Sequence, residues 1–264
     1  MHSNVFDRYR QAESFVHRLD PRLKVVLTAL FILSNLLLPD GAWWGFAASF
    51  VLLMAGSLLA QLSPWLVLRR SFIAVPFALA AVTTTFATPG PPALVLHFGD
   101  MVLSLTRPGL VRFLSIVIRS LLSVQMAILL TSTTSFPDLI HALRHLRLPS
   151  TLVAIISFMY RYLFLLSDEA MRLLRARAAR SARLPSARAG GSVGWRARVA
   201  GNMAGQLFVR SFERSDRVYN AMLARGYDGH LYTLNPHAMK GRDWMTLALF
   251  LLILLALQTL SRLV

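Results

Sequence analysis

The sequence lacks the groups on which several common kinds of active site depend. None of its 264 residues is cysteine, which excludes disulfide bonds, a thiol nucleophile and a thiolate metal site. It contains no Gly-x-x-x-x-Gly-Lys-Ser/Thr loop for nucleotide phosphates, so any ATP chemistry must come from a partner. Acidic and histidine residues are not clustered as a membrane enzyme would need for metal binding or acid–base catalysis. We therefore expect no catalytic residue, no metal ligand and no cofactor in this chain.

Charged residues are also scarce, at 15% of the chain, whereas soluble domains carry roughly 25%. Hydrophobic residues make up 55%, and the mean hydropathy is +0.54. This composition predicts an all-α polytopic membrane protein, because lipid can cover its outward apolar faces. Residues 1–22 are polar, with no apolar segment before Leu23, so we expect no removable signal peptide.

Acidic residues are the scarcer charged class, with 12 against 28 basic residues and a net charge of +16. In a membrane protein this excess indicates cytoplasmic loops held inside by the positive-inside rule, and we predict no nucleic-acid partner. All 12 acidic residues lie outside the apolar segments or at their ends. This argues against the alternative of a secondary transporter, which would use carboxylates within the membrane.

Five apolar segments predict about five transmembrane helices, at residues 23–38, 42–62, 71–87, 109–135 and 243–263. They divide the chain into a cytoplasmic N-terminal arm (1–22), a four-span membrane domain (23–135), a cytoplasmic domain (136–242) and a final transmembrane helix (243–264). The cytoplasmic domain is predicted to contain long helices, at about 136–148, 150–184 and 195–226. The proline-rich loop at 88–108 predicts a short hairpin or re-entrant piece outside.

The charge distribution sets the topology. Residues 168–242 contain 14 lysines and arginines against 5 acidic residues, so we expect them in the cytoplasm with the N-terminal arm. Four spans before residue 136 return the chain to the cytoplasm, and a crossing at 150–166 would carry the arginines outside. We therefore interpret 150–166 as a tilted helix packed against protein, which gives five spans. The alternative is a sixth span hidden in residues 88–108.

The predicted helix at 195–226 has two different faces. At 100° per residue, one side collects Phe208, Phe212, Ser215, Tyr219, Met222 and Leu223. The opposite side carries Arg210, Arg214 and Arg217. We interpret the first side as facing the chain's own membrane domain and the second as turned away from it. The alternative is an interfacial helix that is attracted to anionic lipid in the bilayer.

Both long basic helices end in a similar tripeptide. Ala179-Arg180-Ser181 and Ala224-Arg225-Gly226 each place an arginine in a last helical turn. Capping alone would explain one such end, because cations favour helix C-termini and glycine suits the left-handed cap position. Two similar ends suggest two similar acidic sockets on a paired partner, since a guanidinium can bind a carboxylate through two hydrogen bonds.

Two further features allow either a functional or a structural interpretation. His141 and His145 stand four residues apart on one helix, but Asp138 is the nearest third ligand, and we predict no metal site there. Arg119 lies well inside the fourth span, where an ionisable residue is functional by default unless it is a structural arginine paired with backbone carbonyls.

Several motifs give the chain a resemblance to a known family. They are Leu19-Asp20-Pro21-Arg22-Leu23-Lys24, Leu143-Arg144-His145-Leu146-Arg147-Leu148-Pro149, the two Ala-Arg-X tripeptides, and the run Glu-Arg-Ser-Asp-Arg-Val-Tyr-Asn-Ala-Met-Leu-Ala-Arg-Gly-Tyr-Asp-Gly at 213–229. In these motifs the chain resembles the transmembrane T component of energy-coupling factor (ECF) transporters, in the cobalt/nickel branch called CbiQ. Ser181 stands where the family often has glycine.

The resemblance implies a non-catalytic subunit of an ATP-driven importer in the bacterial cytoplasmic membrane. A T component couples an ABC ATPase dimer, which binds ATP, to a substrate-binding membrane (S) subunit, which binds cobalt or nickel. A small accessory membrane protein is a further candidate partner. Each Ala-Arg-X tripeptide would dock in a groove of one ATPase, with Arg210, Arg214 and Arg217 as a supporting basic face. A T component for another micronutrient is the nearest alternative.

Overall fold

The computed structural model describes residues 9, 12–74, 76, 80–83, 85, 88–98, 101–146, 148–180, 192–229 and 239–263. The chain forms two compact units. Residues 2–146 and 236–264 form the first, which we call the membrane unit. Residues 147–235 form the second, which we call the arginine-rich unit.

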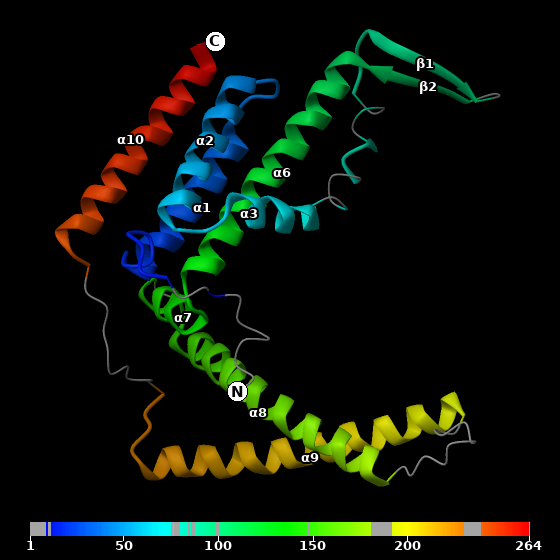
Figure 1. Cartoon of the computed structure of the whole chain (residues 1–264), viewed down its shortest axis with the longest axis vertical. Coiled ribbons are helices and arrows are strands. Elements are labelled where there is room, and N and C mark those ends of the chain that lie inside the picture. The colour runs from blue at the N-terminus through cyan, green and yellow to red at the C-terminus, as the bar shows by residue number, and fades with distance from the viewer. Residues whose placement is uncertain are drawn as a thin grey trace. The chain divides into compact units, whose positions relative to one another are not determined.

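Helices make up most of the membrane unit (Figure 1). Its described elements are α1 (Pro21–Leu37), α2 (Trp43–Leu59), α3 (Pro64–Ser71), η1 (Phe72–Ala74), β1 (Pro92–Phe98), β2 (Met101–Thr106), α6 (Arg107–Thr133), α7 (Phe136–His145) and α10 (Gly241–Leu263). Side-chain caps fix where several begin, because the first amides of a helix have no partner within it. Asp20 accepts from the first turn of α1, Thr106 from α6 and Ser135 from α7.

Apolar side chains of α1, α2, α6, α10 and their ends form the core of the membrane unit. The buried members are Phe31, Leu38, Phe46, Leu53, Ala60, Leu62, Leu122, Leu129, Leu254 and Leu257. α1 lies against α6 and α10, and α2 lies against the same two helices. Large apolar side chains such as Leu36, Trp44 and Val51 are exposed, as expected for a surface that faces lipid.

A two-stranded antiparallel hairpin lies in the loop at 88–108, as one of the two sequence predictions had it. β1 pairs with β2 from Pro92 opposite Thr106 to Phe98 opposite Met101. A transmembrane β-strand needs about 9–11 residues. Strands of 7 and 6 residues are too short to cross a membrane, and the count of five spans stays a prediction.

Three helices in the described part of the chain are long and apolar enough to cross a membrane: α6, α8 (Ser150–Arg180) and α10. α2 is apolar but shorter. The predicted class, a helical membrane protein, is confirmed. α8 qualifies by length and composition alone, so our interpretation of it as a non-crossing helix stays a prediction. The predicted span at 71–87 also stays one, because much of it lies outside the described residues.

α7 is the predicted amphipathic helix, although it ends at His145 rather than at residue 148. It buries Ile140, His141 and Ala142 and lies against α1. The boundary between the two units therefore falls after Leu146, whereas the predicted cytoplasmic domain begins at residue 136.

The described helices of the arginine-rich unit are α8 and α9 (Val193–Ala224). They begin within two residues of the predicted positions. The Ser192 hydroxyl caps α9 by accepting from the amide of Trp195 at 3.2 Å. The predicted end of the first helix, at residue 184, lies outside the described residues. α9 has no fully buried residue, so its sides are largely available to partners.

Candidate functional site

The C-terminal end of α9 is a complete Schellman motif. Arg225 is the C-cap residue, and Gly226 follows it with φ of +80°. The amide of Gly226 donates to the carbonyl of Leu223, and the amide of Tyr227 donates to that of Met222, both at 3.0 Å. This pair of bonds satisfies the last carbonyls and holds the end in one geometry. The capping role that the sequence indicated for Gly226 is confirmed.

The cap explains Gly226 but not the charge of Arg225. A C-cap position accepts many residue types, because the capping bonds come from the amides of the two residues that follow it and not from its side chain. The Arg225 side chain is exposed, and no residue of the described chain forms an ion pair with it. The motif thus presents a guanidinium on a rigid helix end, where it can bind an external carboxylate.

The first tripeptide is described in part. Ala179 and Arg180 are exposed in the last turn of α8. Ser181 lies outside the described residues, so the two ends are comparable in their exposed arginines.

The contacts of α9 with α8 do not follow the predicted division into an apolar and a basic face. From the predicted basic face, Arg210 donates through its Nη1 to Oε1 of Glu169 on α8 at 2.8 Å. Arg214 is half-buried, whereas Arg217 is exposed. The half-buried residues of α9 form a stripe between the two predicted faces: Val199, Met203, Leu207, Ser211, Arg214, Val218 and Met222. Phe208 and Phe212, from the predicted apolar face, remain exposed.

The sequence did not single out Glu169, which is the centre of this helix pair. Its Oε2 also forms an ion pair with Nη2 of Arg172 on its own helix, at 2.7 Å. The Glu169 side chain is 13% exposed, so two arginines from two helices surround a mostly buried carboxylate. Its charge could have indicated this role, because a glutamate in a stretch rich in arginine is expected to pair with one of them.

An apolar groove of about 470 Å³ lies between the first half of α8 and the last half of α9. Its lining includes Ala154, Phe158 and Tyr162 of α8 with Val218 and Met222 of α9. Tyr227, the residue after the glycine cap, lines the same groove. The Schellman motif therefore places the exposed guanidinium of Arg225 two residues from Tyr227, which lines the apolar groove.

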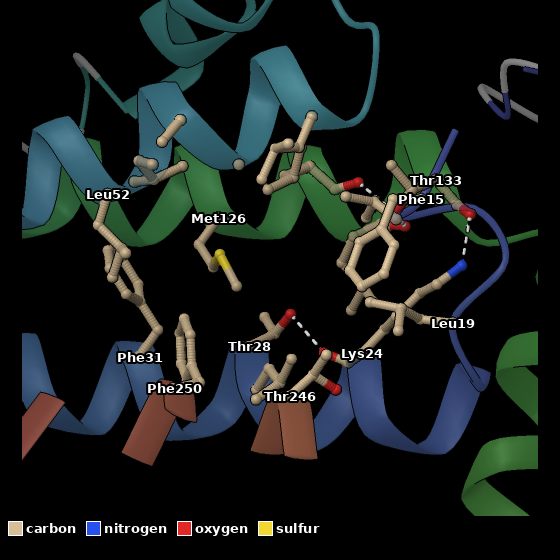
Figure 2. A pocket seen from close by; sticks show the side chains of 18 of the residues that line it. Phe15, Leu19, Lys24, Thr28, Phe31, Leu52, Met126, Thr133, Thr246 and Phe250 are labelled. Atoms are coloured by element: carbon tan, nitrogen blue, oxygen red, sulfur yellow. Dashed lines mark hydrogen bonds between the residues drawn. The ribbon is translucent and has the colours of Figure 1, made fainter. Parts of the chain in front are cut away.

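In the membrane unit, the motif at 19–24 is a structural junction (Figure 2). The Nζ of Lys24 donates to the carbonyl of Thr133 at 3.0 Å, at the end of α6, and to that of His17 at 3.1 Å. Leu23 is 1% exposed, and Asp20 caps α1. One buried ammonium thus ties the N-terminal segment and the end of α6 to the start of α1.

Lys24 also lies at one end of a pocket of about 250 Å³ (Figure 2). Leu52, Met126 and Phe250 line it from α2, α6 and α10, and Phe31 lines it from α1. Its polar lining residues are Lys24 and threonines, with no carboxylate. This chemistry suits a hydrocarbon group and neither a metal ion nor ATP.

Arg119 has partners within the chain. Its Nη2 donates to Oδ1 of Asp40 at 2.8 Å and to the carbonyl of Leu38, and its guanidinium lies over the ring of Phe46. Nearby on α6, the Ser115 hydroxyl accepts from the amide of Gly41. Arg119 therefore attaches α6 to the turn between α1 and α2, which is a structural role.

The two histidines of α7 are adjacent but are not joined by a third ligand. Their ring centroids are 4.6 Å apart, and His145 Nδ1 lies 3.0 Å from the carbonyl oxygen of His141. Asp138 is engaged by the hydroxyl of Ser135 at 2.6 Å. In the part of the chain that the structure describes, no three acidic or histidine residues could hold a metal ion together.

Known proteins resemble this chain over most of its length. A family model described as CbiQ, cobalt transport protein, matches residues 12–235. An uncharacterized protein of Methanocaldococcus jannaschii is 24% identical over 97% of this chain and 86% of its own length. The energy-coupling factor transporter transmembrane protein of Staphylococcus aureus is 27% identical, covering 96% of this chain and 94% of its own. Its counterpart in Leuconostoc gelidum is 27% identical, covering 86% and 85%.

Proposed function

Because the chain belongs to the CbiQ family of cobalt transport proteins, we propose that it is the transmembrane coupling (T) subunit of an ECF-type ABC importer. In this role it passes the ATP-driven motion of two ATPase subunits to a substrate-binding membrane subunit. The observation that carries the proposal is the exposed Arg225 on the rigid cap of α9. Similar relatives that are named transmembrane proteins of such transporters support it.

The family description favours cobalt as the cargo, with nickel as the related choice. The relatives' names specify no cargo, so a T subunit for another micronutrient is the second candidate. The cargo would bind to the partner membrane subunit and ATP to the ATPases, which leaves this chain without a cofactor or a catalytic residue. The cytoplasmic membrane of a bacterium is the expected location.

The geometry suggests how force would be transmitted. A guanidinium fork can bind a carboxylate in an ATPase groove through two hydrogen bonds. α9 has 32 residues and is therefore about 48 Å long, at 1.5 Å per residue. A displacement of its Arg225 end moves a long rigid helix and the apolar groove that it shares with α8.

Charge reversal at the two helix ends tests the proposal. Arg225→Glu combined with Arg180→Glu should abolish uptake of radioactive cobalt and weaken co-purification with the ATPases by about tenfold or more, because like charges would then meet. Arg198→Glu is the matched control, since Arg198 is exposed on the same helix but lies near its opposite end. Normal uptake and an intact complex in the double variant would disprove the coupling role of these ends.

A further inference from the structure

The contact between α8 and α9 depends on one carboxylate. Glu169 Oε1 accepts from Arg210 of α9 at 2.8 Å, and Oε2 forms an ion pair with Arg172 of α8 at 2.7 Å. We propose that Glu169 is a positioning residue, the pivot that fixes how the two helices cross and hence how far apart their arginine ends lie. The inference rests on the proposed function, because it assumes that both ends engage a partner.

Apolar packing alone would not fix the crossing. α9 has no fully buried residue, and α8 buries Val153 and Ala154 alone among its described side chains. On one side of the pivot the helices enclose a groove rather than a close-packed seam. Apolar contacts are also non-directional, whereas a charged hydrogen bond prescribes both distance and orientation.

The three side chains have separate tasks. Arg172 lies one turn after Glu169 on the same helix, so their ion pair holds the carboxylate in place before α9 is engaged. The other carboxylate oxygen is then directed at Arg210. Without the carboxylate, two guanidiniums would face each other, in a segment where residues 168–242 already carry 14 basic against 5 acidic residues. Two guanidiniums that face each other repel, so the two helices would separate or rotate relative to each other.

A small rotation of the helices about Glu169 produces a large displacement of their arginine ends. Arg180 lies 11 residues beyond Glu169, and Arg225 lies 15 residues beyond Arg210. At 1.5 Å per residue the two arms are about 16 Å and 22 Å long, so a rotation of about 20° displaces the ends by roughly 6–8 Å. Such a displacement is at least about twice the length of a hydrogen bond, so both ends could no longer fit two fixed sockets together.

Distance measurement on the full-length chain in lipid nanodiscs tests the pivot directly. The natural sequence has no cysteine, so spin labels can be attached to cysteines placed at the exposed positions Ala176 and Ala221, one on each arm. We expect one narrow distance distribution for the parent chain and a clearly broader one for Glu169→Gln and for Arg210→Gln. Glu213→Gln, which removes an exposed acid from α9, is the matched control and should leave the distribution unchanged.

A charge exchange separates positioning from mere loss of charge. In Glu169→Arg with Arg210→Glu, the carboxylate moves to α9 and faces two arginines of α8, so the narrow distribution should return. In the assembled transporter, cobalt uptake should fall by about two- to fivefold in Glu169→Gln, as expected for a lost ion pair, and recover in the exchange.

The pivot is refuted if Glu169→Gln keeps the narrow distance distribution of the parent chain, or if the charge exchange fails to restore that distribution. It is also refuted if cobalt uptake stays at the parent level in a variant whose distance distribution has broadened. The labelled chain is measured without its partners. The distance result therefore stands even if charge reversal at Arg180 and Arg225 leaves transport intact. That second outcome would disprove the proposed function and not the pivot.

Discussion

The interior of the membrane unit and the helix ends of the arginine-rich unit use their charged residues in opposite ways. In the membrane unit, buried or half-buried charges have partners within the chain: Lys24 binds two backbone carbonyls, Arg119 binds Asp40, and Asp20 caps α1. In the arginine-rich unit, Arg180 and Arg225 are exposed at the helix ends. Charges of the first kind stabilise the unit that contains them, because desolvation makes an unpaired group costly. Those of the second kind add little stability and are available to a partner.

This contrast predicts two classes of variant. Substitutions at satisfied charges and close contacts of the membrane unit should lower its stability. Substitutions at the ends of the arginine-rich helices should leave that stability almost unchanged and weaken the complex with the ATPases.

The largest loss of stability is expected from Lys24→Ala. The substitution removes the buried ammonium and leaves the carbonyls of His17 and Thr133 without their donor, which should cost about 3 kcal/mol. Thermal unfolding of the purified chain in detergent measures the effect. Lys240→Ala, at an exposed lysine, is the control and should unfold like the parent. Equal stability of the two variants would show that the junction at 19–24 is not structural.

A smaller loss is expected from Arg119→Gln. The variant leaves the Asp40 carboxylate and the Leu38 carbonyl without the guanidinium, which should cost about 2 kcal/mol in the same unfolding measurement. Arg112→Gln is the matched control: Arg112 lies 4.0 Å from the same carboxylate and is 56% exposed, so it should change stability by less than about 0.5 kcal/mol. A larger effect at Arg112 would contradict the assignment.

Helix packing in the membrane unit should respond to a single methyl group. A Cβ on Gly45 would lie 2.9 Å from Cδ2 of Leu38 and would also clash with Ser261 of α10, so Gly45→Ala should cost about 1–2 kcal/mol. Gly56→Ala meets Leu129 at 3.4 Å, an ordinary contact, and should be nearly neutral. The difference between the two unfolding midpoints isolates the close approach of α2 and α10.

The sequence predicted those features that depend on local pattern. Helix class, the starts of α8 and α9 and the glycine cap follow from composition, periodicity and turn chemistry. The partner of Arg119 was not predicted, because Asp40 is 79 residues away and their contact requires the packing of α6 on the first turn. The face of α9 that meets α8 was also missed, since the helical projection treats α9 alone and does not include the pairing of Arg210 with Glu169.

The smallest effect on stability, and the sharpest test of the contrast, is expected from Gly226→Ala. At φ of +80° a Cβ is strained whatever the space around it, so the cap should lose about 1 kcal/mol locally. Hydrogen exchange should then accelerate at the amides of Gly226 and Tyr227, and ATPase retention should fall by about fivefold, while the unfolding midpoint of the membrane unit stays the same. Gly201→Ala is the control within α9: its Cβ meets open space in a helical position, so α9 should gain about 0.5–1 kcal/mol with no loss of retention. If Gly226→Ala instead lowered the unfolding midpoint as much as Lys24→Ala, the end of α9 would be a structural element. The contrast between charges paired within the chain and exposed charges available to a partner would then be wrong.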